Sequence, residues 1–549
     1  MTTFWTYKNL ARITAGTWRV PPADAEAVLP AASRADARSC GPVLWHDTRD
    51  LTPGQCYLAI QGENFDGHDF VEQAFKQGAA MAIVNADSPP QSSIINHQSA
   101  ILEVPDTVAA LQDLARAYRD ELFSGGCKVI GVAGSNGKTT TRHLIHHVLT
   151  HAGKVGTQSP KSFNNHLGVP LTLLAARPTD DFVACEIGTN HPGEIDFLSA
   201  ICRPDIAVIT SIGEEHLEFF GDIEGVAREE SDILKHIVKR GVAITPGPQV
   251  VRGELVWHYH RKCRDCVGVI RVNGFGRCEP KGFEEPEELE QIARATAEWR
   301  YCVVKPDRNA TLFVNKFRFW HWEDDDDVLN ARMLPISVPG PHNCFNAAYA
   351  LLVAHQLGVC IDEATSSLGS ASLPSQRMNI HTIGEDEDSV ALIDDAYNAN
   401  PDSVQIALRA MADLGKDSSE RVVVVLGDML ELGDASESKH YEIGQQLAYF
   451  DSDYTGARQP CVGLVILIGS MIQRAAGPIE IAWTRSGAGR LHRFPEWTDD
   501  LPDQVAALLQ PGDTVLLKAS RGMRLERLIP AIEKRFGKPT PTVGNRGLQ

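Results

Sequence analysis

The chain has 549 residues, of which 43% are hydrophobic and 22% charged, with 45 glycines and 31 prolines. This length is too great for one core and predicts three or four domains, and the composition is that of ordinary globular protein, which excludes wholesale disorder. With 52 Lys and Arg against 71 Asp and Glu, the net charge of −19 excludes a general binder of nucleic acids or of anionic membranes.

The chain has no apolar run as long as a membrane span, which needs about 18 residues. Its first ten residues, MTTFWTYKNL, lack the charged start and apolar stretch of a signal peptide. The 12 cysteines are scattered rather than spaced as a disulfide framework, a usage typical of a reducing cytosol. We therefore expect a cytoplasmic protein without membrane insertion. We also expect a monomer.

The first clear pattern of elements ends near residue 123. Residues 56–60 and 81–84 are predicted to be short strands, and residues 69–77 a helix closed by Gly78. We set the first domain at residues 1–123, as a β-α-β module.

The second unit opens with an apolar strand at residues 128–133. Further strands are expected near residues 182–187 and 206–212, with helices between them. Around residues 250–330 the chain turns rich in Cys, Glu and aromatic residues, which we interpret as part of the second unit plus an insertion. We set the second domain at residues 124–373.

After Pro374 strands and helices alternate strictly. Strands are predicted at 390–393, 422–426, 462–468 and 514–517, and helices near 403–414, 437–450, 502–509 and 524–534. Such alternation predicts a parallel, doubly wound sheet and an α/β fold class. We set the third domain at residues 374–549.

The strongest local signal is GVAGSNGKTTT at residues 131–141, with an apolar strand before it and a helical pattern after it. Glycines in such a loop let backbone N–H groups surround phosphate oxygens, Lys138 would neutralise them, and the Thr139 hydroxyl could ligate Mg²⁺. Val132 stands where the general pattern has Gly. A phosphate-binding loop (P-loop) is thus predicted, the alternative being a Gly-rich turn with a solvated lysine, and it indicates only that a nucleotide is bound.

Two further polar residues follow predicted strands of this unit. Glu186 ends one strand, and His216 lies just past the next. Because ligand sites of parallel sheets lie at the carboxyl ends of strands, Glu186 is a candidate second Mg²⁺ ligand beside the P-loop. A solvent-exposed glutamate and a purely structural histidine are the alternatives.

These residues and five other stretches resemble the Mur ligases, the amide-forming enzymes of peptidoglycan precursor synthesis. The similar stretches are DTR at 47–49 with GENFDGHDF at 62–70, GSNGKTT at 134–140, NNHLGVPLTL at 164–173, EIGTNHPGEI at 186–195, DDAYNANP at 394–401 and GDMLELG at 427–433. They lie in order from about residue 41 to residue 530, and only the region around 250–330 is outside the resemblance.

The resemblance implies three domains: an N-terminal domain for a UDP-sugar, a central P-loop ATPase domain, and a C-terminal Rossmann-like domain that brings an amine. ATP would phosphorylate the terminal carboxylate of the substrate, and the amine would attack the acyl phosphate. The chain is most similar to members that add D-alanyl-D-alanine to UDP-N-acetylmuramoyl-tripeptide, two small-molecule partners. Another amide ligase, adding a diamino acid or glutamate, and a catalytically weak nucleotide-binding relative that serves as an interaction module stay open.

The resemblance also assigns site residues. ATP would be bound by Gly134, Ser135, Asn136, Gly137, Lys138, Thr139, Thr140, Asn343, Asn346, Arg377 and Asp395; two Mg²⁺ ions by Thr139, Glu186, His216 and Glu230; and substrates by Asp47, Thr48, Arg49, Asn164, Asn165, Tyr397 and Asn398. Lys138, His216 and Glu230 would be catalytic. The alternatives are a helix N-cap for Asn343 and a turn residue for Asp395.

Position 230 departs from the family pattern. Most Mur ligases carry, fourteen residues after the metal-binding histidine, a lysine whose carbamate helps to bind the second Mg²⁺; counting from His216 leads here to Glu230. We predict that Glu230 provides the carboxylate directly. The alternative is an acidic helix face and a weakened metal site.

A cysteine cluster lies in the predicted insertion. Cys263 and Cys266 form one C-x-x-C pair, and Cys278 follows twelve residues later. A third cysteine and nearby histidines could complete a structural zinc site, but a second C-x-x-C pair is missing. Zinc ligation and ordinary reduced cysteines both stay open.

Overall fold

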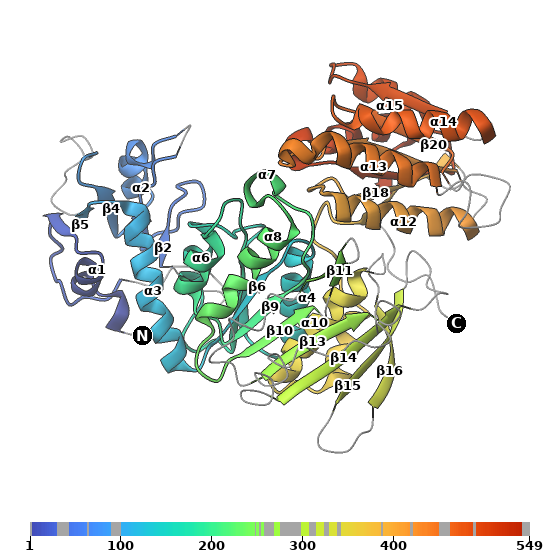
Figure 1. The fold of residues 1–549 in the computed structure, drawn as a ribbon. Coiled ribbons are helices and arrows are strands. Elements are labelled where there is room, and N and C mark those ends of the chain that lie inside the picture. Colours follow the sequence, from blue (N-terminus) through green and yellow to red (C-terminus); the bar gives the residue numbers. More distant parts are fainter. Residues whose placement is uncertain are drawn as a thin grey trace.

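The computed structural model describes residues 3–29, 43–62, 65–88, 100–246, 249–251, 254–256, 268–274, 298–306, 315–322, 329–336, 342–385, 388–417, 421–449, 462–486 and 490–540. Three large sheets follow one another along the chain, each with its own helices (Figure 1). The α/β class is therefore confirmed. None of the described helices is both long and apolar enough to cross a membrane.

The first sheet has the order β1-β5-β4-β3-β2, with β1 antiparallel to β5 and the other pairs parallel. Its strands are β1 (Thr17–Val20), β2 (Leu44–Trp45), β3 (Cys56–Leu58), β4 (Met81–Asn85) and β5 (Ala100–Val104). Its helical elements are η1 (Thr3–Trp5), α1 (Tyr7–Ile13), η2 (Gly67–Phe70) and α2 (Val71–Lys76). The predicted strands correspond to β3 and β4, and the predicted helix to η2 and α2.

Helix α3 (Thr107–Gly125) contacts elements of both the first and the second unit. Asp106 caps its first turn, and Gly126, at φ +92°, ends it. The Tyr118 hydroxyl donates a hydrogen bond to the Ala176 carbonyl at 2.9 Å, and the fully buried Arg119 pairs with Asp205 at 2.7 Å. The helix thus crosses the limit set at residue 123, and the domain limits stay predictions.

The second sheet has the order β16-β15-β14-β13-β10-β9-β6-β8-β7. Its strands are β6 (Lys128–Ala133), β7 (Gly156–Gln158), β8 (Phe182–Glu186), β9 (Ile206–Ile209), β10 (Val242–Pro246), β13 (Gly268–Gly274), β14 (Glu298–Pro306), β15 (Asn315–Trp322) and β16 (Leu329–Ile336), with β11 (Gln249–Val251) and β12 (Glu254–Val256) as a separate ribbon. In this order all neighbours from β14 to β7 pair in parallel, whereas β15 pairs antiparallel with both β14 and β16. The described strands between 268 and 336 thus extend the central sheet.

The helices of this unit are α4 (Lys138–His151), α5 (Gly168–Ala175), α6 (Glu194–Cys202), α7 (Leu217–Phe220), α8 (Ile223–Glu230), η4 (Ser231–His236), α10 (His342–Gln356) and α11 (Ile361–Leu368). In α4 the apolar positions 144, 145, 148 and 149 are all buried, as their spacing predicts. The helix ends in a Schellman motif, because Lys154 N donates to Leu149 O at 3.0 Å and Gly153 adopts φ +76°.

The third sheet has the order β21-β20-β19-β22-β18-β17-β23. Its strands are β17 (Asn379–Ile383), β18 (Val390–Asp394), β19 (Val422–Gly427), β20 (Leu464–Ile468), β21 (Arg490–Phe494), β22 (Thr514–Lys518) and β23 (Pro539–Thr540). Its helical elements are α12 (Pro401–Asp417), η6 (Gly433–Ala435), α13 (Ser436–Tyr449), η7 (Ile472–Ala475), α14 (Ala476–Ser486), α15 (Leu501–Leu508), η8 (Arg521–Met523), η9 (Leu525–Leu528) and α16 (Ile529–Phe536).

The predicted parallel strands form the centre of the third sheet, and an antiparallel edge adds to them. The four predicted strands are β18, β19, β20 and β22, and they pair in parallel. However, β17 and β23 add an antiparallel edge. The sequence of β17, NIHTI, lacks the continuous apolar run of a central strand, and most of its residues are only half-buried.

Candidate active site

A cleft of about 1780 Å³ lies between the central and C-terminal units. The P-loop, the ends of β8 and β9, and α10 line it from the central unit. The loop after β18, α12 and the start of α13 line it from the C-terminal unit. Most of the predicted nucleotide and metal residues therefore share one cavity.

The P-loop has the backbone that its glycines predict. Gly134 has φ +118° and Gly137 has φ +90°, a region that residues with a Cβ rarely adopt. A Cβ at Gly137 would also lie 2.5 Å from the side-chain oxygen of Asn346. Both conformation and space therefore require glycine where the loop enters α4.

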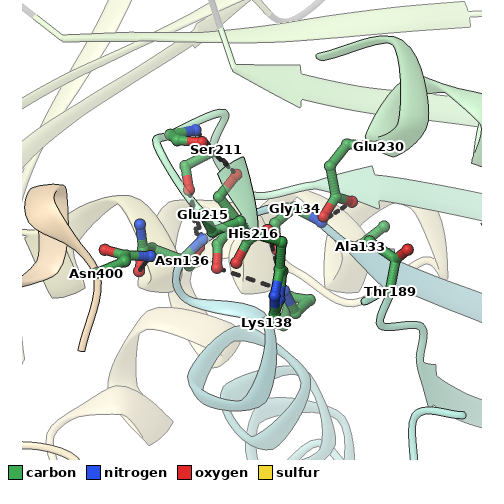
Figure 2. Close-up of polar contacts among 12 residues, drawn as sticks. Ala133, Gly134, Asn136, Lys138, Thr189, Ser211, Glu215, His216, Glu230 and Asn400 are labelled. Atoms are coloured by element: carbon green, nitrogen blue, oxygen red, sulfur yellow. Dashed lines mark hydrogen bonds and ion pairs between the residues drawn. The ribbon is translucent and has the colours of Figure 1, made fainter. Parts of the chain in front are cut away.

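Lys138 is folded onto its own loop (Figure 2). Its ammonium group donates to Gly134 O at 2.5 Å and to Ser135 O at 3.3 Å, and lies 3.7 Å from a carboxylate oxygen of Glu215. Burial acts to lower the pKa of Lys138, but Glu215, Glu230 and Glu186 together raise it, so this side chain is a cation. It is the group best placed to meet a phosphate in the loop.

The structure brings Glu186 and Thr139 together. Thr139 Oγ1 donates to Glu186 Oε1 at 3.0 Å, and Asn164 donates to the same oxygen at 3.1 Å. The buried Arg142 donates from Nε to Glu186 Oε2 at 3.2 Å. A hydroxyl and a carboxylate so arranged are hard oxygen ligands, which fit Mg²⁺.

Glu230 is fully buried behind the P-loop and is not among the residues that line the cleft. Its Oε2 accepts a hydrogen bond from Gly134 N at 2.6 Å (Figure 2). Its carboxyl group also hydrogen-bonds with that of Glu215, and burial raises the pKa of both. Oε1 of each receives no N–H donor among the described residues, so this pair also has oxygen atoms that could accept a cation.

His216 lies at the edge of the same cleft, with its backbone at φ +48°. Its Nδ1 is 2.6 Å from Glu431 Oε2 of the C-terminal unit, and this contact lowers the pKa of Glu431. In the part of the chain that the structure describes, neither a hydrogen bond nor an ion pair joins His216 to Glu230. Nor does that part contain three His, Cys, Asp or Glu side chains grouped as a metal site. The metal roles of both residues stay predictions.

Asn343 and Asn346 lie in α10, next to the P-loop. Asn346 donates to Asn343 Oδ1 at 2.8 Å and accepts from the Thr141 hydroxyl at 3.1 Å. Asn343 stands inside the helix rather than before it, so it is not the N-cap. Both residues line the cleft, beside Gly137 and Thr140.

The C-terminal unit reaches the P-loop directly. Arg377 Nη2 donates to Thr139 Oγ1 at 3.0 Å, and its guanidinium lies 4.3 Å from the centre of the Tyr397 ring. Asn400 donates to the Asn136 side chain at 3.0 Å (Figure 2). The Tyr397 hydroxyl hydrogen-bonds with Ser162.

Asp395 directly follows β18 and is another polar residue of the C-terminal unit in the cleft. Asp395 accepts a hydrogen bond from Lys518 Nζ at 2.7 Å, and Lys518 also donates to the Asn398 carbonyl at 3.0 Å. Asp395 Oδ1 accepts from Met378 N at 3.2 Å, so this aspartate holds two chain segments together.

The substrate-binding residues predicted in the N-terminal unit lie away from this cleft. Asp47 and Arg49 form an exposed ion pair of 2.6 Å in the N-terminal unit, and Thr48 is buried. None of the three lines the cleft, whereas Asn164 and Asn165 do. Asn165 Oδ1 accepts from Gly168 N at 2.9 Å, at the start of α5.

Sequence reasoning missed four charged residues of the site: Arg142, Glu215, Lys439 and Lys518. Each pairs with a residue at least 44 positions away, so no local motif marks it. The predicted zinc ligands Cys263, Cys266 and Cys278 lie outside the described residues.

Comparison with known proteins identifies the family of this chain. Three family descriptions match successive parts of it: "Mur ligase family, catalytic domain" at residues 44–119, "Mur ligase middle domain" at 132–262, and "Mur ligase, glutamate ligase domain" at 376–521. UDP-N-acetylmuramoyl-tripeptide–D-alanyl-D-alanine ligase of Bacillus subtilis is 31% identical over 95% of this chain and 97% of its own length. The chain belongs to the Mur ligase family.

Solved structures agree with this family. MurF from Acinetobacter baumannii aligns with 96% of this Mur ligase and 99% of its own chain, at a TM-score of 0.70 and 27% identity. The ligase MurF from Thermotoga maritima, solved in complex with ADP, aligns with 90% of this chain and 97% of its own, at a TM-score of 0.63 and 24% identity, and so shares the fold. The three-domain Mur ligase architecture is confirmed.

Proposed function

We propose that this Mur ligase adds D-alanyl-D-alanine to UDP-N-acetylmuramoyl-tripeptide, with ATP as energy source, in peptidoglycan precursor synthesis. The observation that carries the proposal is that Lys138, Thr139 and Glu186 of the P-loop unit meet Arg377 of the C-terminal unit in one cleft. A P-loop that is completed by a second domain suits a reaction in which phosphoryl transfer must be coupled to the arrival of an amine. The relatives described above bear the corresponding enzyme name.

The chemistry follows from the charges in the cleft. A carboxylate becomes an acylating agent once its oxygen is part of a phosphate leaving group, and the attacking amine then forms the amide. Lys138 neutralises phosphate oxygens, while Asn164 and Arg142 fix the orientation of Glu186. Arg377 brings a further positive charge from the C-terminal unit to Thr139.

Thr139 and Glu186 would hold one Mg²⁺ ion, and His216 and Glu230 a second. Bound Mg²⁺ offsets the negative charge of two anions that must approach each other. Asn343 and Asn346 would contact the adenine, Arg377 and Asp395 the nucleotide from the C-terminal side, and the loop at Tyr397 and Asn398 a substrate.

Three broader features belong to the same proposal. The uridine part of the substrate would bind in the N-terminal unit at Asp47, Thr48 and Arg49. The domain limits would be 1–123, 124–373 and 374–549. The protein would act as a monomer in the cytoplasm.

One assay separates this proposal from its alternatives: phosphate release from ATP with UDP-N-acetylmuramoyl-tripeptide, compared with D-alanyl-D-alanine, with diaminopimelate and without an amine. We expect release that depends on D-alanyl-D-alanine. Dependence on diaminopimelate instead would identify another Mur-type ligase. Release that no amine changes, or no release at all, would identify a catalytically weak relative.

A further inference from the structure

Residues 213–218 of the central unit lie between the P-loop and the C-terminal unit. On the P-loop side, Gly213 N donates to Ser135 Oγ at 2.9 Å, and Glu215 faces Lys138 at 3.7 Å. This segment also carries His216. Its position therefore determines where the side chains of Glu215 and His216 lie beside the phosphate loop.

On its other side the segment forms hydrogen bonds with the C-terminal unit. Glu214 N donates to Asp402 Oδ2 at 2.8 Å, and a Cβ at Gly213 would lie 2.3 Å from that same oxygen. Further along, Glu218 N lies 3.4 Å from Glu431 O, to which it donates. Both hydrogen bonds use the backbone of the segment, and neither involves the Glu214 side chain.

The ion pair between Lys439 and Glu214 adds a side-chain link. Lys439 Nζ, on α13, lies 2.7 Å from Glu214 Oε2, with side-chain exposures of 4% and 13%. Lys439 also pairs with Glu442 of its own helix at 3.0 Å. A buried lysine needs a carboxylate partner. Glu442 lies on the same helix and is available whether or not the two units are in contact, whereas Glu214 is available only when they meet.

We propose that Lys439 is a positioning residue of the ligase reaction: by pairing with Glu214 across the interface, it holds residues 213–218 against the P-loop. The inference rests on the proposed function, because it concerns the same site. It explains how the unit that brings the amine also arranges the unit that binds ATP. Lys439 acts through this segment, which carries Glu215 and His216 beside the phosphate loop.

A double-mutant cycle tests the pair. Lys439→Met and Glu214→Gln each remove one charge, and the two are also combined. We expect each single change to lower kcat for D-alanyl-D-alanine-dependent phosphate release by about 5- to 150-fold, the range of ordinary coupling between sites. The double variant should be no slower than the slower single variant, because the second change removes nothing further.

Two controls separate positioning from a general loss of structure. Lys534 and Asp503 form an exposed ion pair of 3.2 Å within the C-terminal unit, so Lys534→Met and Asp503→Asn should leave kcat unchanged. In the Lys439 and Glu214 variants, the KM for UDP-N-acetylmuramoyl-tripeptide should also stay unchanged. Losses that multiply in the double variant, or three variants with the kcat of the unchanged protein, would overturn the proposal.

Small-angle scattering makes the outcome independent of the assay. With an ATP analogue present, Lys439→Met and Glu214→Gln should both show a larger radius of gyration than the unchanged protein, and equal radii would contradict the inference. If the unchanged protein lacks any D-alanyl-D-alanine-dependent release, the proposed function fails, and scattering still decides whether the pair holds the units together.

Discussion

At the scale of single residues, a buried carboxylate beside a P-loop has two uses: it can accept a backbone N–H group or coordinate a cation. Glu230 does the first, through Gly134 N at 2.6 Å. Its Oε1 receives no N–H donor among the described residues, so the second use stays available. A glutamine at this position would distinguish the two uses. Its amide oxygen accepts a hydrogen bond almost as well as a carboxylate oxygen but is a poorer ligand for a cation.

Glu230→Gln separates these uses. If Glu230 binds the second Mg²⁺, the variant should need roughly tenfold more Mg²⁺ for half-maximal activity, measured by phosphate release at increasing Mg²⁺. Unchanged Mg²⁺ dependence would exclude the metal role. Glu230→Lys gives the complementary result: activity that rises with added bicarbonate would show that a carbamate can take the place of the glutamate.

His342 gives a prediction on pH. Burial lowers its pKa from 6.5 to about 4, although Asp395 opposes this shift. The unfolded chain takes up a proton near pH 6.5 whereas the folded chain does so only near pH 4, so stability falls as the pH drops through this window. At pH 5 the loss from this residue is about 2 kcal/mol.

His342→Asn should therefore reduce the difference between the denaturant midpoints at pH 7 and pH 5. His151→Asn, at an exposed position, is the matched control and should leave that difference as it is. An identical pH dependence in the His342 variant and the unchanged protein would contradict the prediction.

At the scale of elements, sequence patterns predict the strand-loop-helix of the P-loop because all of its determinants are local. The apolar strand, the glycines and the 3.6-residue spacing of α4 lie within 25 residues of one another. Strand β21 was missed for the opposite reason: Arg490 and Arg493 are exposed, and its place at the sheet edge depends on β20.

Gly137→Ala tests the P-loop as an element. It combines φ +90° with a Cβ only 2.5 Å from Asn346 Oδ1, so we expect a loss of about 1–3 kcal/mol in stability and much weaker ATP binding. Gly153→Ala is the control, because Gly153 has φ +76° but open space around it. Calorimetric titration with ATP and thermal unfolding measure both, and equal effects of the two substitutions on ATP binding would contradict the steric argument.

At the scale of the whole molecule, α3 belongs to two units. It follows β5 in the chain, yet its Arg119 completes the buried environment of Asp205 in the central unit. Removing one partner of a buried ion pair costs about 3–5 kcal/mol. We therefore expect α3, most of which precedes residue 124, to stabilise the central unit as well.

Fragments of the chain test this. A fragment of residues 105–373 should unfold at a clearly higher temperature than one of residues 124–373, whereas residues 374–549 should unfold cooperatively alone, since their sheet has its own buried cluster. Thermal unfolding and limited proteolysis would show the difference. Equal unfolding temperatures of the two central fragments would show that residues 105–123 do not stabilise the central unit.

The sequence by itself determined the α/β class, the P-loop, most strands of the third sheet and the Mur ligase family, because these depend on short-range spacing and on stretches kept in order. Only the tertiary structure decided that Arg142 orients Glu186, that Lys518 holds Asp395, and that Lys439 reaches Glu214. Their partners are 44 to 225 residues away along the chain. The physical reason is that a buried charge is stabilised by whatever opposite charge folding brings within a few ångströms, and no local pattern records that partner.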